Sequence, residues 1–180
     1  MSDYRPYYPD STNELTLEWV MRQFRRLSDV IGNRPVYTAP TAEVTANRVG
    51  TTASSVTDLQ TIFDGNVFTG VEAAATPGAN FEFSFTGIRS VQGFVMRAAY
   101  EGSSTHHYTV SLYNYLTTAW DTYETLDFTE DYTYRYIEIL NGKNYMSGGS
   151  AIVQFHHPDA GNITHNLLID YLAIIQQVET

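Results

Sequence analysis

Cysteine is absent from this chain of 180 residues, and Lys143 is its single lysine. Without cysteine there is no disulfide framework, no thiolate metal site and no Cys nucleophile. Ten basic residues stand against 20 acidic ones, which gives a formal net charge of -10. Such an acidic surface repels nucleic acid and anionic lipid, so we predict that the chain binds neither nucleic acid nor a membrane.

Several motifs are also missing. No apolar run is long enough for a membrane-spanning helix, and residues 1–5 do not lead into the apolar stretch of a signal peptide. The sequence holds no glycine-rich phosphate loop, no GxSxG and no HExxH motif. We therefore predict a protein that is not an enzyme and that binds or assembles instead.

Aromatic residues are abundant, at 14% of the chain, and 14 of them are tyrosines. Tyr4, Tyr7 and Tyr8 lie within residues 1–10, together with two prolines. We interpret this segment as an extended N-terminal arm. It is either a frayed terminus or a segment that becomes ordered on a neighbouring subunit.

Residues 11–32 carry the clearest pattern in the chain. Ser11 and Glu14 form a capping box, and Gly32 is a typical C-terminal stop. Between them, five apolar residues recur at alternating spacings of three and four: Leu17, Val20, Phe24, Leu27 and Ile31. The spacing predicts an amphipathic α-helix for oligomerisation or docking.

Trp19 lies off this apolar stripe, so the helix would be apolar over more than one seam. A lone helix of this length is marginal in water and must pack on something. The alternatives are the protein's own β domain and a self-associating bundle of copies. We favour the bundle, as a homotrimer, because the heptad register is regular and residues 33–54 resemble a linker.

Residues 55–180 show short alternating stretches separated by turn residues. Phe81, Phe83 and Phe85 alternate with polar residues, and residues 167–175 form a closing run that we interpret as a strand. So many strands at close spacing predict a sandwich. The expected fold class is mainly β: a single jelly-roll-like antiparallel β-sandwich preceded by an N-terminal amphipathic α-helix.

Two sets of residues are candidates for metal binding. The five histidines include two adjacent pairs, but neighbours in a strand point to opposite faces and rarely bind one ion together. We therefore expect the histidines at loop rims. Asp64, Asn66 and Thr69 surround Gly65, and their oxygens suit a calcium ion. The Asp-Gly-Asn run also fits an ordinary Asx turn without metal.

The chain from about residue 55 to 176 resembles galactose-binding-like (discoidin-type) sandwiches. The resemblance rests on residues 62–66 with Thr69 and on the runs 81–85, 91–97, 134–139 and 168–174. It implies a structural calcium on Asp64, Asn66 and Thr69, and no other cofactor. The acidic ligand that some members supply from the last strand has no counterpart here.

The first 35 residues resemble the start of small tailed-bacteriophage virion proteins, which trimerise or dock through such helices and carry a β-sandwich outward. The resemblance implies that this chain binds copies of itself and other virion proteins through its arm and helix. It also implies a location on the surface of the phage particle after synthesis in the host cytoplasm.

Two function hypotheses follow. The first is a non-enzymatic phage virion structural protein: a head decoration, collar or tail-fibre component. The alternative is a carbohydrate-binding module or host-surface adhesin domain, in which Trp120, Tyr113 and Tyr115 stack on sugar rings. Both can hold together, since a virion protein can bind host surface glycans.

Overall fold

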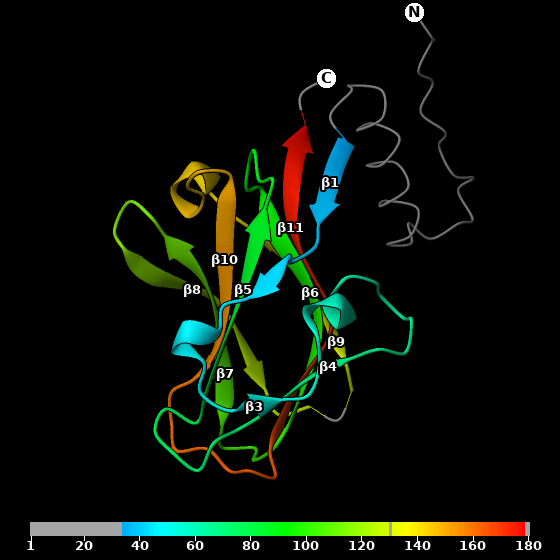
Figure 1. Cartoon of the computed structure of the whole chain (residues 1–180), viewed down its shortest axis with the longest axis vertical. Helices are drawn as coiled ribbons and strands as arrows, with labels where there is room; N and C mark the ends of the chain where they lie inside the picture. The colour runs from blue at the N-terminus through cyan, green and yellow to red at the C-terminus, as the bar shows by residue number, and fades with distance from the viewer. Residues whose placement is uncertain (1–33, 130, 179–180) are drawn as a thin grey trace, which may run out of the picture. The chain divides into compact units, whose positions relative to one another are not determined.

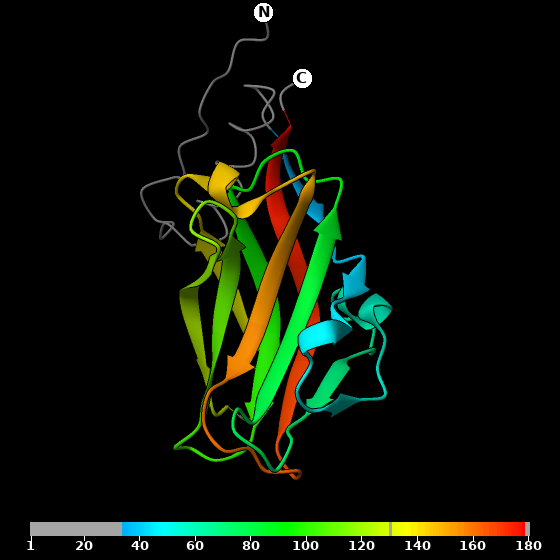
Figure 2. The same ribbon diagram turned by 60° about the vertical axis from the view of Figure 1, so that its left-hand side comes forward.

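The computed structural model describes residues 34–129 and 131–178, and the region Pro35–Val178 forms one compact unit. Two antiparallel sheets face each other in this unit (Figures 1 and 2). Sheet A has the strand order β3-β4-β11-β6-β9, and β1 also pairs with β11. Its strands are β1 (Arg34–Thr38), β3 (Thr51–Thr52), β4 (Phe68–Val71), β6 (Gly93–Glu101), β9 (Thr133–Glu138) and β11 (Asn166–Val178).

Sheet B has the strand order β2-β5-β10-β7-β8. Its strands are β2 (Ala42–Glu43), β5 (Ala79–Thr86), β7 (His107–Asn114), β8 (Ala119–Asp127) and β10 (Ser150–His157). Neighbours in the sheet are often distant in the sequence, since β10 lies between β5 and β7. The fold therefore brings together side chains that are far apart along the chain.

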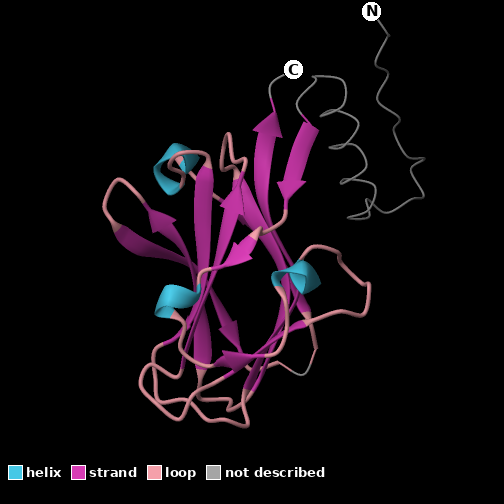
Figure 3. Cartoon of the chain, viewed as in Figure 1, coloured by secondary structure: helices cyan, strands magenta, loops and turns pink. Residues whose placement is uncertain are grey.

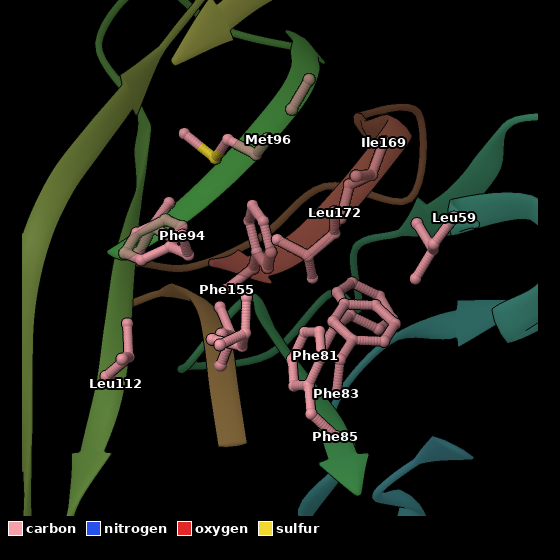
Figure 4. Packing of buried hydrophobic residues seen from close by; sticks show 14 of the residues in the cluster. Leu59, Phe81, Phe83, Phe85, Phe94, Met96, Leu112, Phe155, Ile169 and Leu172 are labelled. Atoms are coloured by element: carbon pink, nitrogen blue, oxygen red, sulfur yellow. The ribbon is translucent and has the colours of Figure 1, made fainter. Parts of the chain in front are cut away.

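The core lies between the sheets because side chains alternate along each strand. β5 turns Phe81, Phe83 and Phe85 inward, and all three are fully buried. Phe68 of β4 meets Phe81 and Phe83 edge to face, with ring centroids 5.7 and 5.0 Å apart. Figure 4 shows the three β5 rings gathered in this core. Burial of each ring contributes about 1.5–3 kcal/mol.

The closing strand is confirmed, because β11 pairs with β6 from Asn166 to Ile175. The register shifts between Ile169 and Tyr171, so Asp170 occupies a β-bulge. Its buried carboxylate lies 2.9 Å from Arg97 Nη1 and accepts the Phe63 N–H at 3.3 Å. The bulge thus ties the loop before β4 to the middle of sheet A.

The expected fold class is wrong in its helical part. Within the described residues there is no α-helix, and the helical turns are three short 3-10 helices (Figure 3): η1 (Thr45–Asn47), η2 (Val56–Leu59) and η3 (Gly142–Tyr145). The physical reason is that the core of the described residues is buried by packing one sheet on the other, so no α-helix contributes to it. The corrected fold class is mainly β, with two antiparallel sheets forming a sandwich.

Residues 11–32, where the helix is expected, lie outside the described residues. In the part of the chain that the structure describes, no helix is both long and apolar enough to cross a bilayer.

Strands also occur before residue 55. The sequence indicates a linker over residues 33–54, yet β1, β2 and β3 fall within that range. β2 extends sheet B by pairing with β5, and β3 extends sheet A by pairing with β4. Strands as short as β2 and β3 show no alternation that a sequence pattern can reveal.

Candidate functional site

The outward face of sheet B carries a line of polar side chains, which we call the polar row: Glu82, Gln154, Ser111 and Thr122. The strand register places these residues side by side on β5, β10, β7 and β8. Gln154 Nε2 donates to Glu82 Oε1 at 3.3 Å, and the hydroxyl oxygens of Ser111 and Thr122 are 3.0 Å apart. Two hydrogen-bonded pairs therefore order the row, in which Glu82, Ser111 and Gln154 are only 4%, 2% and 8% exposed.

Asn80 and His156 lie opposite each other on β5 and β10, next to the polar row. Asn80 Nδ2 donates to Glu82 Oε1 and to the Asn47 carbonyl, both at 2.9 Å. Asn80 Oδ1 and His156 Nδ1 have no hydrogen-bond partner among the described residues. Burial lowers the pKa of His156, against the effect of the Glu82 charge. The neutral ring has one donor and one acceptor nitrogen.

Three aromatic rings stand at the end of this face. Tyr113 of β7 and Trp120 of β8 lie opposite each other, with ring centroids 5.2 Å apart at 70°. Tyr115 lies 5.0 Å from Tyr113 at 86°, and its N–H donates to the Asn144 carbonyl at 2.8 Å. All three rings are partly exposed, and burial raises the pKa of Tyr115. The three residues predicted as glycan contacts therefore form one aromatic group.

A β-bulge determines which way Trp120 points. Val110 pairs with Glu124, but the next residue of β7 pairs with Thr122, so Tyr123 is an extra residue in β8. On the other side of this bulge, Leu126 points into the core and is 1% exposed. Without the bulge, Trp120 would share the buried face of Leu126, because the two residues are an even number apart.

The outward face of sheet A carries a different set of rings. Tyr134 and Tyr136 of β9 are 54% and 59% exposed. The guanidinium of Arg97 lies 4.6 Å from the ring centroid of Phe63 and 4.3 Å from that of Tyr132. This set is not predictable from the sequence pattern, because Phe63 and Tyr132 are in loops and their approach to Arg97 depends on the folded sheet.

The calcium candidates form a hydrogen-bonded turn. The Asn66 N–H donates to Asp64 Oδ1 at 2.9 Å, and Asn66 Nδ2 donates to Asp64 Oδ2 at 3.1 Å. These bonds lower the pKa of Asp64 and occupy both of its oxygens. Thr69 lies in β4, where its N–H donates to Ser54 Oγ at 2.9 Å. The geometry is that of an Asx turn, and calcium binding there stays a prediction.

A buried group of ionisable side chains lies at one end of the sandwich. Glu72, His106 and His165 bring potential ligand atoms within 4.8 Å of one another, and His157 is fully buried beside them. The histidines are expected at loop rims, and this group is not predictable from the sequence pattern. No spacing signal indicates it, since its members come from four separate segments.

The predicted oligomerisation and docking residues lie outside the described residues, so the structure places none of them. They are Tyr4, Tyr7, Tyr8, Leu17, Trp19, Val20, Phe24, Leu27 and Ile31.

Comparison with known proteins supports the fold. No protein-family model matches the sequence, and no curated protein matches it. Among solved structures, the chain is similar to a mutant of a carbohydrate binding module family 29, with a TM-score of 0.53 and 11% identity over 79% of this chain and 92% of that one. It is also similar to a structure described as carbohydrate binding module family 29, with a TM-score of 0.50 and 13% identity over 79% of this chain and 89% of that one. At these identities the likeness establishes the β-sandwich fold alone.

Proposed function

We propose that this chain is a non-catalytic carbohydrate-binding module, and that its glycan lies over the outward face of sheet B. One observation carries the proposal: the pre-ordered polar row ends at the aromatic group of Trp120, Tyr113 and Tyr115. A pyranose ring offers apolar C–H surfaces and a rim of hydroxyl groups. Aromatic rings match the first, and fixed polar groups match the second.

The roles divide by chemistry. Trp120 and Tyr113 provide ring surface for one sugar unit, because both are partly exposed. Thr122 is exposed and His156 partly exposed, so both can meet sugar hydroxyls as donor or acceptor, and the largely buried Glu82 and Gln154 support the face beneath. The existing contacts of Glu82 with Asn80 and Gln154 fix these groups, so little side-chain entropy is lost on binding.

A binding role is favoured over hydrolysis by the chemistry of this face. Glycoside hydrolysis needs two carboxyl groups about 5–9.5 Å apart across the sugar. The polar row contributes a single carboxylate, Glu82, and its neighbours across the strands are amide and hydroxyl groups. The solved structures of similar fold are themselves described as carbohydrate binding modules.

The virion role stays a prediction. It depends on the arm and helix predicted within residues 1–32, which lie outside the described residues. The solved structures of similar fold give it no support, since both are described as carbohydrate binding modules. Location on a phage particle likewise stays a prediction, and the glycan-binding proposal does not depend on it.

The test is binding of the full chain to a panel of soluble polysaccharides by affinity electrophoresis, followed by calorimetry with the best oligosaccharide. Trp120→Ala should weaken binding roughly 30-fold or more, which corresponds to about 2 kcal/mol, because a Trp anchor often dominates an interface. Tyr136→Ala is the matched control, since it removes an exposed ring from sheet A. It should leave the affinity unchanged.

Two results would overturn the proposal. One is the absence of binding to any polysaccharide in the panel. The other is that Trp120→Ala weakens binding no more than Tyr136→Ala does.

A further inference from the structure

A buried carboxylate is surrounded by imidazole and phenol groups where three loops meet at one end of the sandwich. Glu72 follows β4, His106 precedes β7 and His165 precedes β11. His165 Nδ1 lies 3.2 Å from Glu72 Oε2, and His157 Nδ1 lies 3.8 Å from Glu72 Oε1. Tyr100 donates its hydroxyl proton to Glu72 Oε1 at 2.9 Å. We call Glu72, His106, His157 and His165 the histidine cluster.

Several polar atoms of the cluster are buried without a partner. His157 is 0% exposed, and neither of its ring nitrogens has a hydrogen-bond partner in the described part of the chain. His106 Nδ1 and the Tyr108 hydroxyl are likewise buried and unpaired there. Each buried polar group without a partner destabilises a fold by about 1–3 kcal/mol. Four unpaired polar atoms in one place indicate a binding site, whose ligand or ion would supply the missing interactions.

The surrounding backbone holds the cluster closely. The Asn162 N–H donates to Glu72 Oε2 at 2.8 Å, which orients the carboxylate. The Gly78 N–H donates to the His157 carbonyl at 3.0 Å. A Cβ atom at Gly78 would collide with His157 Nδ1, and one at Gly161 would meet Gly78. Glycine at both positions lets the loops close over the His157 ring.

Each adjacent histidine pair contributes one member to the cluster. His106 and His157 take part, whereas His107 pairs across the sheet with Asp127 and His156 lies on the outward face of sheet B. The two members of each pair therefore face different surroundings, as alternation along a strand predicts. Residues from different strands meet instead.

We propose that Glu72, His106 and His165 bind one divalent first-row transition cation, of which zinc is the best fit. Their ligand atoms all lie within 4.8 Å of one another, so modest side-chain movement brings them to bonding distance. Two imidazoles with one carboxylate are a typical zinc ligand set. Calcium and magnesium prefer oxygen ligands throughout, so this set selects against them.

The other groups around the proposed cation are also consistent with a metal site. Three protein ligands leave a fourth tetrahedral position for water or for His157. Tyr100 and the Asn162 N–H donate to the Glu72 carboxylate, and the Tyr100 hydroxyl also lies 3.2 Å from His165 Nδ1, as supporting hydrogen bonds do around metal ligands. His106 and His165 are partly exposed, which gives a cation a route from solvent. The cation would join the segments that contain Glu72, His106 and His165.

The experiment uses the full 180-residue chain, freed of metal by EDTA and dialysed. Zinc chloride is titrated in by calorimetry, and cobalt chloride by visible absorption. We expect one zinc per chain, an increase of several degrees in Tm, and the strong visible bands of four-coordinate cobalt. The His106→Ala/His165→Ala double variant should lose at least about 100-fold in zinc affinity, since two of the three ligands are removed.

The matched control is the His107→Ala/His156→Ala double variant, which removes the neighbouring histidine of each pair. It should keep the zinc affinity and the cobalt spectrum of the unmodified chain. Absence of stoichiometric zinc or cobalt binding would overturn the proposal. So would an equal loss in both double variants, because binding would then depend on surface histidines.

A second measurement does not require any variant to fold. Side-chain nitrogen resonances of the five histidines are followed by NMR as zinc is added to the unmodified chain. Changes at His106 and His165 with little change at His107 support the site. Changes at His107 and His156 alone would rule it out.

Discussion

At Thr118 the backbone adopts a left-handed conformation, with φ of 55°, in the turn between β7 and β8. A β-branched residue is strained in this region, because its Cβ atom approaches the backbone. Its hydroxyl donates to the Thr117 carbonyl at 2.7 Å, which is a weak local compensation. The turn nevertheless positions the strands that carry Tyr113 and Trp120.

Replacement of Thr118 by glycine should stabilise the protein by about 1 kcal/mol, because glycine adopts positive φ without strain. Thr117→Gly is the control, since Thr117 is not in the left-handed region. That variant should be neutral or destabilised, owing to the greater freedom of the unfolded chain. Urea unfolding of both variants measures the difference, and equal stability of the two would refute the strain argument.

Asp121 shows how hydrogen bonds make stability depend on pH. Its Oδ2 accepts from Asn114 Nδ2 and from the Tyr145 hydroxyl, both at 2.8 Å. These bonds hold the pKa of Asp121 below its ordinary value of 3.8. Because the folded-state pKa is the lower one, the contribution is present above the unfolded pKa. It is lost as the pH falls through the folded value.

Tyr145→Phe removes one of the two donors to Asp121. The free energy of unfolding should therefore fall more at about pH 7 than at about pH 2, since the carboxylate is protonated at the lower pH. Chemical denaturation at the two pH values measures the difference. Asp121→Asn is the companion variant and should flatten the same pH dependence; a Tyr145→Phe loss that is independent of pH would contradict this account.

At the scale of elements, two β-bulges change the side of the sheet to which side chains point, compared with the prediction from the residue pattern. The bulge at Asp170 in β11 turns a carboxylate toward Arg97, and the bulge at Tyr123 in β8 turns Trp120 outward. Sequence alternation predicts strands but assumes an unbroken register. A single inserted residue reverses the facing of everything beyond it.

Asp170→Ala should destabilise the protein by about 2–4 kcal/mol, because it leaves Arg97 without its partner in a largely buried setting. It also removes the acceptor of the Phe63 N–H. The comparison variant is Glu43→Ala, which removes the more exposed pair with Arg48 at 3.4 Å. That pair should contribute less than about 1 kcal/mol. Thermal unfolding measures both, and similar losses would contradict the assignment.

At the scale of the whole molecule, the sandwich presents two outward faces of different chemistry. The outward side of sheet B carries the polar row next to Trp120, with Thr122 exposed and the other three side chains largely buried. On sheet A, Val95, Ala173 and Ile175 form a small apolar cluster with Tyr171. The outward side of sheet B has an aligned polar row, whereas the exposed tyrosines of sheet A lie on a sheet whose outward side also holds this buried apolar cluster. This contrast explains why a Tyr136 variant is a suitable control for a Trp120 variant.

The sequence by itself determines the β character of this part of the chain, because period-two alternation at Phe81–Phe83–Phe85 is typical of a strand, although β5 is buried on both sides over most of its length. It also indicates the rings that could contact a glycan, since Trp and Tyr are chemically suited to sugars wherever they lie. Local pattern and residue type are sufficient for both predictions.

Only the tertiary structure decides which residues meet. The polar row joins β5, β10, β7 and β8, and the histidine cluster joins segments as distant in the chain as those of Glu72 and His165. Strand order, register and the bulge at Tyr123 determine these contacts. None of these three features can be recognised from the spacing of residues along the chain. A sandwich forms its surfaces by pairing distant strands, so its candidate sites emerge from the folded sheets.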